Sequence, residues 1–178
     1  MFHRPEIGGV KFDIRYILLL QSTKPLKVFA YDRFWLRFAN KEFSLDNYDV
    51  YEKHFTVMNY NDQHLEQMFC HDFIKKFEQQ YPSFEWKEIE KKIFAMFKQV
   101  FEAATSLDPP QGIGNSPQSR AMYACDLMLK WDKKEIVPQI LEINWGPDCK
   151  RATEYYPEYF NDVFYTLYLD EPRNATLL

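Results

Sequence analysis

Alternating apolar and polar residues predict a strand over Lys11–Leu20. Because successive side chains of a strand leave opposite faces, the run has two different faces. The apolar face carries Phe12, Ile14 and Tyr16, and the polar face carries Lys11, Asp13 and Arg15. Two further strands are predicted over Leu26–Tyr31 and Phe34–Ala39, followed by a loop over residues 40–61.

Apolar residues at steps of three and four then predict helices. The first spans Asp62–Gln79 with a break near Cys70, and the second spans Trp86–Ala104, with Ser83 as its N-cap. A last amphipathic helix begins at Pro157.

Between the helices lie two strands, Met122–Lys130 and Val137–Asn144, which are joined by a turn at residues 131–134. This mixture of helices and antiparallel hairpins predicts an α+β (mixed α/β) fold with a mostly antiparallel sheet. We expect one domain over residues 1–169 that the chain enters partway through, and a flexible tail over residues 170–178.

Composition narrows the class of protein. Hydrophobic residues make up 46% of the 178 residues and aromatics 18%, which is typical of a packed globular protein. The net charge of −4 gives no basic footprint for nucleic acid, and no apolar run is long enough to span a bilayer. Three scattered cysteines indicate reduced thiols, and the predicted location is cytoplasmic.

The second hairpin carries the candidate metal site. Glu142 and Asn144 are two residues apart on one strand and therefore share a face. If the turn centres on residues 133–134, Asp126 falls nearly opposite Glu142. Two carboxylates and an amide oxygen suit Mg²⁺. The alternative is an exposed strand residue at Asp126 and an ordinary strand end at Glu142 and Asn144.

The first strand and Arg37 supply candidate anion ligands. Arginine can bind phosphate or carboxylate with two parallel hydrogen bonds, and lysine can act as a point charge. The alternative for the polar face is a solvated ladder of Lys11, Asp13 and Arg15. An inward-facing Arg37 would need an anion, whereas an outward-facing one would not.

The ordered motifs resemble the tubulin–tyrosine ligase-like family, whose fold is ATP-grasp. The resemblance covers nearly the whole chain and implies the C-terminal half of such a domain. It rests on the segments YDRFWLRF (31–38), YEKHFTVMNY (51–60), SRAMYACDLMLKWD (119–132), PQILEIN (138–144) and FNDVFYTLYLD (160–170).

The resemblance implies roles for nine residues. It makes Asp126, Glu142 and Asn144 magnesium ligands, and it places Arg15 and Arg37 at phosphate or substrate carboxylates. Nucleotide-site positions are implied for Lys11, Asp13, His54 and Thr56. One departure concerns Val57, which stands where the family has an asparagine in the motif H-L-T-N.

The implied reaction uses ATP and Mg²⁺. ATP phosphorylates a carboxylate to an acyl-phosphate, and an amine then attacks it, forming an amide and releasing phosphate. The implied partners are tubulin or another protein acceptor and a free amino acid, with no nucleic acid or membrane, and microtubule association is expected. Nuclear presence is left open.

Three functions remain open at this point. The first is the amino-acid ligase, for which we expect no activity from this chain by itself. The second is a catalytically inactive pseudoenzyme or regulatory binding module that retains the ATP-grasp fold. The third is an α+β domain whose polar hairpin is purely structural.

Overall fold

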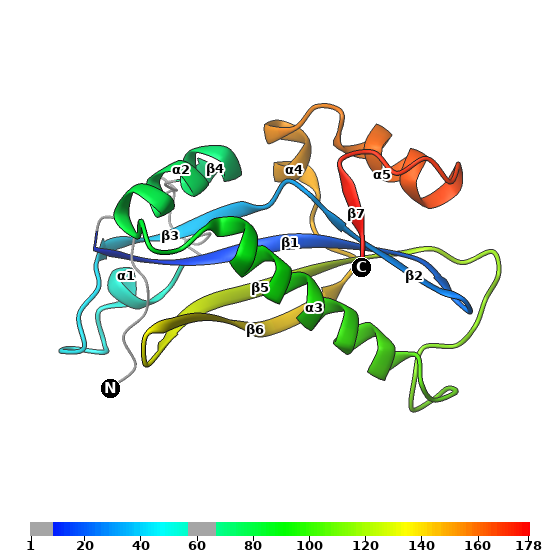
Figure 1. The fold of residues 1–178 in the computed structure, drawn as a ribbon, viewed down its shortest axis with the longest axis horizontal. Helices are drawn as coiled ribbons and strands as arrows, with labels where there is room; N and C mark the ends of the chain where they lie inside the picture. The colour runs from blue at the N-terminus through cyan, green and yellow to red at the C-terminus, as the bar shows by residue number, and fades with distance from the viewer. Residues whose placement is uncertain (1–8, 57–66) are drawn as a thin grey trace. The chain divides into compact units, whose positions relative to one another are not determined.

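The computed structural model describes residues 9–56 and 67–178 (Figure 1). Within them the fold is α+β with a largely antiparallel sheet, as predicted. The strands are β1 (Val10–Thr23), β2 (Leu26–Tyr31), β3 (Trp35–Glu42), β4 (Gln67–Phe69), β5 (Ala121–Asp132), β6 (Glu135–Trp145) and β7 (Ala175–Leu177). The helices are α1 (Tyr51–His54), α2 (Cys70–Gln80), α3 (Trp86–Ala104), α4 (Lys150–Tyr155) and α5 (Tyr159–Tyr168).

The sheet is organised around β1. Its main path runs in the order β4-β3-β1-β2-β7, while β5 pairs with both β1 and β6. The strand β1 pairs antiparallel with β2 and β3, β2 pairs antiparallel with β7, and β3 pairs antiparallel with β4. β1 has 14 residues and is long enough to pair with two strands on one chain segment each: its first half pairs with β3 and its second half with β2.

The chain forms two compact units, and β1, α3, β5 and β6 contribute residues to both. The first unit comprises residues up to Arg15, Phe34–Glu90 and Asp126–Glu142. The second comprises Tyr16–Arg33, Lys91–Cys125 and Ile143–Leu178.

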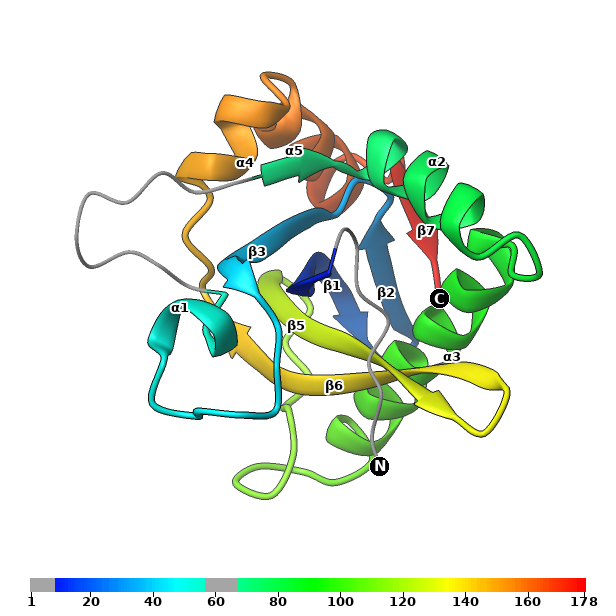
Figure 2. The ribbon, with the colours of Figure 1, turned by 90° about the vertical axis from the view of Figure 1, so that its left-hand side faces the viewer.

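Aromatic packing forms the core of the first unit. The buried Phe73 ring of α2 lies 5.3 Å from Phe12, 5.9 Å from Phe34 and 5.1 Å from Trp86, measured between ring centroids. Edge-on and offset rings are the favoured arrangements of aromatic pairs. In the same unit, α1 packs against β3 (Figure 2). This core fixes the strands on which the polar cluster described below is built.

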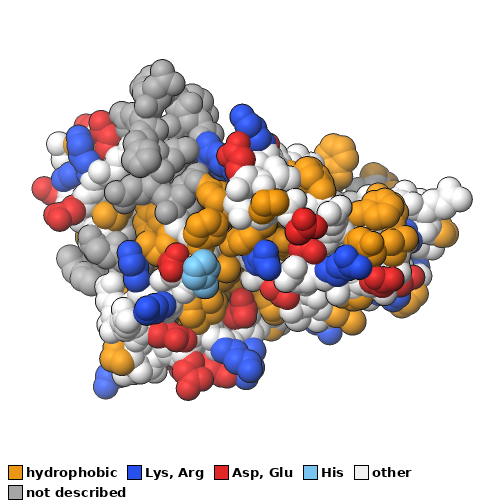
Figure 3. All heavy atoms as spheres, turned by 90° about the horizontal axis from the view of Figure 1, so that it is seen from above, with side chains coloured by type: hydrophobic (Ala, Val, Ile, Leu, Met, Phe, Trp, Pro, Cys, Tyr) orange, Lys and Arg blue, Asp and Glu red, His pale blue; other side chains and the backbone are white. Residues whose placement is uncertain are grey.

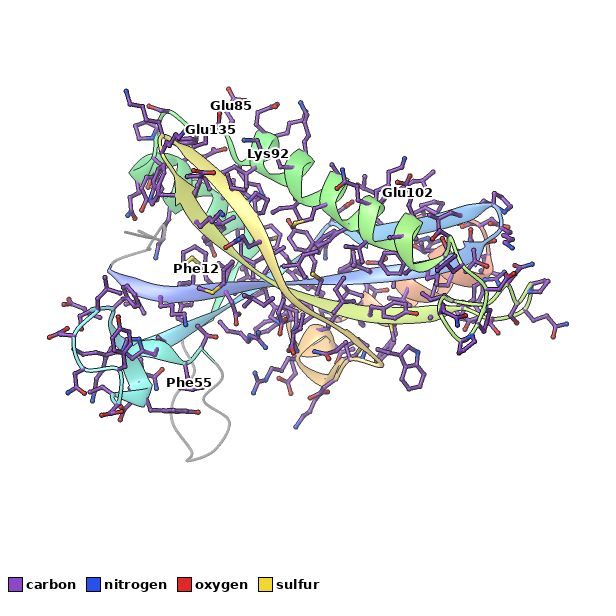
Figure 4. The ribbon with its side chains drawn as sticks, turned by 90° about the horizontal axis from the view of Figure 1, so that it is seen from below. Phe12, Phe55, Glu85, Lys92, Glu102 and Glu135 are labelled. Atoms are coloured by element: carbon purple, nitrogen blue, oxygen red, sulfur yellow. The ribbon has the colours of Figure 1, made fainter. Side chains whose placement is uncertain are left out.

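The second unit has a separate aromatic core. Tyr16 of β1 lies 5.9 Å from Phe94 and 5.6 Å from Phe97 of α3, again between ring centroids. Lys92 and Glu102 project from the outer side of the same helix (Figure 4). Burying the apolar stripe while leaving the charged stripe outside is the expected behaviour of an amphipathic helix.

The sequence located most elements but misplaced the start of one helix and missed two short helices. The helix predicted over Asp62–Gln79 starts at Cys70, since Gln67–Phe69 is strand β4; residues 62–66 lie outside the described part. The loop predicted over residues 40–61 contains the short helix α1, and α4 was not predicted. Such short elements are set by tertiary packing because helices under about 12 residues are marginal on their own.

The predicted N-cap of α3 is also wrong. Ser83 lies three residues before the helix, which begins at Trp86. Instead, the backbone N–H of Trp86 donates to the Glu78 carboxylate at 2.9 Å. A carboxylate from the preceding helix thus satisfies a donor that a serine would otherwise serve.

The C-terminal segment differs from the predicted flexible tail. Residues Ala175–Leu177 form β7, which pairs with β2 (Figure 1). The Asn174 amide donates to the buried Asp162 carboxylate at 2.8 Å, and the Thr176 hydroxyl donates to Asp32 at 2.6 Å. These long-range contacts are invisible to local propensity, which explains the different prediction.

The surface carries charges of both signs. On the face seen in Figure 3, Lys and Arg side chains are interspersed with Asp and Glu. Among the described residues, no helix combines the length and apolar character required to cross a bilayer.

Candidate active site

The polar face of β1 meets an arginine from β3. Asp13 and Arg37 lie directly opposite each other in the β1–β3 register. Arg37 donates from Nε to Asp13 Oδ1 and from Nη2 to Asp13 Oδ2, both at 2.7 Å. Both residues are buried, with exposed fractions of 3% for Asp13 and 8% for Arg37. The structure therefore places Arg37 inward, on an anion that the protein itself supplies.

Asp126 of β5 extends this pair into a chain of alternating charges. Arg15 donates to Asp126 from Nε at 2.6 Å and from Nη2 at 2.7 Å. Arg37 Nη2 lies 2.8 Å from Asp126 Oδ2. The charge cluster, defined here as Asp13, Arg37, Asp126 and Arg15, belongs entirely to the first unit.

The contacts within the charge cluster shift the pKa values of its members. Burial by itself would raise the pKa of Asp126, but hydrogen bonds and charge from Arg15 and Arg37 outweigh it and lower that pKa. Burial likewise opposes the charge on Arg37, while Asp13 and Asp126 raise the pKa of its guanidinium above the ordinary value. Both groups are therefore ionised at neutral pH.

The end of α1 and the residues after it contact the polar face of β1. The Thr56 hydroxyl donates to Asp13 Oδ2 at 2.7 Å, and the Lys11 ammonium donates to the backbone carbonyl of His54. The His54 ring stacks on Tyr48, with centroids 5.5 Å apart. Lys11 thus contacts His54 and Asp13 contacts Thr56, and the role of all four residues at a nucleotide stays a prediction.

The two remaining predicted ligands lie on β6. Glu142 and Asn144 are both exposed, and their spacing puts them on one face of the strand. Asp126 and Glu142 belong to the first unit, and Asn144 belongs to the second. Within the described residues, no group of three His, Cys, Asp or Glu side chains is arranged to hold a metal. A common site for the three ligands stays a prediction.

The chemistry of these donors suits magnesium, although Asp126 already binds arginine. Glu142 and Asn144 offer accessible oxygens, which are the ligands this cation prefers. Both oxygens of Asp126 already accept hydrogen bonds from arginine. These contacts and the one from Arg37 occupy most of the acceptor capacity of Asp126, so a metal there would share the carboxylate with the two arginines.

Sequence reasoning identified the members of the cluster but missed how they pair. It left open whether Arg37 faces inward onto an anion, and it named neither Asp13 as the partner of Arg37 nor Arg15 as a partner of Asp126. The signal for the first pair was present: oppositely charged residues occupy buried positions in two apolar strands, and such charges are rarely buried unpaired. Choosing the partner required the β1–β3 register.

A groove of about 320 Å³ lies elsewhere, in the second unit. It is largely apolar, and its lining includes Arg120, Met122, Phe160, Phe164, Leu167 and Tyr168. None of the predicted site residues contributes to it.

Nearly the whole chain matches the model of a known protein family. Residues 3–175 match the model of the tubulin–tyrosine ligase family. The chain belongs to this family. The ATP-grasp-like α+β fold expected from the resemblance is therefore supported by both the match and the observed architecture.

Individual relatives give the same result. Tubulin–tyrosine ligase-like protein 12 from Mus musculus is 54% identical over 98% of this chain, and the Homo sapiens protein is 54% identical over 97%. Tubulin glycylase 3E from Tetrahymena thermophila is 25% identical over 92% of the chain and 12% of its own length. The chain spans 28% of the length of the first two relatives.

Proposed function

We propose that this protein is part of an ATP- and Mg²⁺-dependent carboxylate–amine ligase that adds an amino acid to tubulin or another protein. The observation that carries the proposal is the pair of arginines held side by side on Asp126. Both guanidinium groups can bind phosphate or carboxylate oxygens with two parallel hydrogen bonds. The side chain of Arg15 is partly exposed, which would allow it to meet an anionic ligand.

The two arginines would share the work of binding anions. The Arg15 side chain is 20% exposed and reachable from solvent, whereas the Arg37 side chain is only 9% exposed. In the proposed reaction Arg15 binds the substrate carboxylate or the phosphate being transferred, and Arg37 stabilises the charge that develops there. No nucleophile from the protein is required.

Magnesium and nucleotide are assigned by the same proposal. Asp126, Glu142 and Asn144 would hold the metal, and Lys11 and His54 would line the nucleotide site; Asp13 and Thr56 would lie at that site without contact to the nucleotide. When bound, Mg²⁺ offsets phosphate charge during transfer. The choice of acceptor draws on the names of relatives, which include a tubulin glycylase and a "probable tubulin polyglutamylase TTLL9" that is 28% identical over 83% of the chain. A cytoplasmic location on or near microtubules follows from that choice.

A second candidate is a pseudoenzyme that keeps the fold and binds a partner without ligating. The closed pairing within the charge cluster favours it, because arginines neutralised by carboxylates need no substrate for stability. Val57, in place of the family asparagine, also favours it; its structure lies outside the described residues.

Ligation by the full-length protein decides between these candidates. The protein would be incubated with tubulin, Mg-ATP and labelled tyrosine, glutamate or glycine, with label on tubulin as the readout. A ligase should incorporate one of them, and Glu142→Gln should abolish incorporation because it removes a charged metal ligand.

Glu135→Gln is the matched control. Glu135 is an exposed glutamate on the same strand, at the turn of the hairpin (Figure 4), and its substitution should leave incorporation unchanged. If full-length protein incorporates none of the three amino acids while still binding tubulin, and Glu142→Gln binds equally well, the pseudoenzyme is the correct alternative.

A further inference from the structure

Asp13 is buried and already accepts three hydrogen bonds from within the protein. Its Oδ1 accepts from Arg37 Nε, and its Oδ2 accepts from both Arg37 Nη2 and the Thr56 hydroxyl, all at 2.7 Å. Only 3% of the residue is exposed. A nucleotide or metal could reach this carboxylate only if the surrounding residues moved, and it would then compete with charge-assisted hydrogen bonds, which are among the stronger ones in proteins.

Thr56 is committed in the same way. A hydroxyl has one hydrogen to donate, and that hydrogen points at Asp13. The segment carrying Thr56 is tied to β1 at a second point, since the His54 carbonyl accepts from Lys11. Lys11 and Asp13 lie on the same face of β1. The segment 54–56 is therefore anchored to alternate residues of one strand.

These contacts restrict the orientation of Arg37. Two parallel hydrogen bonds to Asp13 fix the plane of its guanidinium, and the contact with Asp126 fixes its Nη2 end. Thr56 in turn restrains rotation of the Asp13 carboxylate about its last torsion. Three residues, from β1, β5 and the segment after α1, thus hold the guanidinium of Arg37 on β3 in one orientation.

We propose that Asp13 and Thr56 are positioning residues that hold Arg37 in the orientation in which it meets an anionic substrate group, and that neither of them contacts nucleotide or metal. This inference rests on the proposed anion-binding role of Arg37. It revises the nucleotide-lining role that the family resemblance implies for both residues.

The first test observes Arg37 without any ligand. In ¹⁵N NMR spectra of the 178-residue protein, the Nε–H groups of Arg15 and Arg37 should exchange slowly with solvent because both donate to carboxylates. Thr56→Val should speed exchange at Arg37 by about tenfold, the expected effect of losing one hydrogen bond to a charged group. Arg15, held by Asp126, should keep its rate.

Two variants make this readout specific. Thr56→Ser retains the hydroxyl and should restore slow exchange at Arg37. Thr105→Val removes a hydroxyl that donates to the Phe101 carbonyl at the same 2.7 Å, but in the second unit, and should leave both arginines unchanged. Unaltered exchange at Arg37 in Thr56→Val would overturn the proposal.

The second test measures binding by calorimetry with inorganic pyrophosphate and with adenosine as separate probes. The proposal expects Thr56→Val to weaken pyrophosphate binding by about tenfold through Arg37 and to leave adenosine binding as in the wild type. Loss of adenosine binding with intact pyrophosphate binding would show a direct nucleoside contact and overturn it. If wild-type protein binds no pyrophosphate, the proposed function fails, whereas the exchange measurement still decides the positioning of Arg37.

Discussion

At the residue scale, Asp126 is the central member of the charge cluster because it contacts both arginines. Its removal leaves Arg15 without its two hydrogen bonds to carboxylate and leaves Arg37 with Asp13 alone. The sequence predicted that Asp126 was functional from its position within an apolar strand. It did not predict that the first partners of Asp126 are cations within the protein.

We expect Asp126→Asn to lower the free energy of unfolding at pH 7 by about 3–5 kcal/mol, the usual cost of breaking a buried ion pair. The folded-state pKa of Asp126 is lowered, so its ion pairs stabilise the fold fully above the unfolded-state value of about 4. This stabilisation is lost as the pH falls through the folded-state pKa. Urea unfolding between pH 7 and pH 3 should show the two proteins converging in acid.

Asp132→Asn serves as the control, since Asp132 is exposed at the end of the same strand. It should change the unfolding free energy by less than about 0.5 kcal/mol. A constant difference between wild type and Asp126→Asn across the pH range would contradict the ion-pair explanation.

At the element scale, the connection between α3 and β5 depends on a close backbone approach. Ile113 N–H donates to the Ala104 carbonyl at 2.7 Å, which binds the connection to the last residue of α3. A Cβ added at Gly112 would lie 2.1 Å from the Leu107 carbonyl oxygen and 2.9 Å from that of Ala104. Both neighbours are backbone atoms and cannot rotate away.

Gly112→Ala should therefore destabilise the protein by about 3 kcal/mol, at the upper end of the range for overpacking. Gly146→Ala is the informative comparison: Gly146 has φ +65° but nothing lies within 4 Å of its added Cβ. Only the left-handed conformation is strained there, at about 1 kcal/mol. Thermal unfolding of both variants would test whether Gly112→Ala is the more destabilising of the two. Equal losses of stability would contradict this prediction.

At the scale of the whole molecule, the last residues of the chain complete the second unit. The Asp162 carboxylate is buried and accepts from both Tyr31 and Asn174, and β7 adds a strand beside β2. Burial and the neighbouring Asp162 raise the pKa of Tyr31 well above its usual value, so the hydroxyl remains a donor.

Deletion of residues 172–178 should lower Tm by several degrees. In a protein of this size, each loss of about 1 kcal/mol in the free energy of unfolding lowers Tm by about 2–4 °C. The deletion removes β7 and one of the donors to buried Asp162. Thr176→Val, which removes only the exposed bond to Asp32, should shift Tm little. An unchanged Tm after the deletion would mean that the segment contributes nothing to stability.

The sequence by itself determined the fold class, the long strands and α3, because these follow from local periodicity of apolar residues. It also selected the charged residues of the site, because charges within apolar strands are conspicuous. Tertiary structure alone decided α1, α4 and the ordered C-terminal strand, whose stability comes from contacts distant in sequence. It also decided the pairing of Asp13 with Arg37 and of Asp126 with Arg15, since strand register, which brings residues 24 and 111 positions apart into contact, is not a local property.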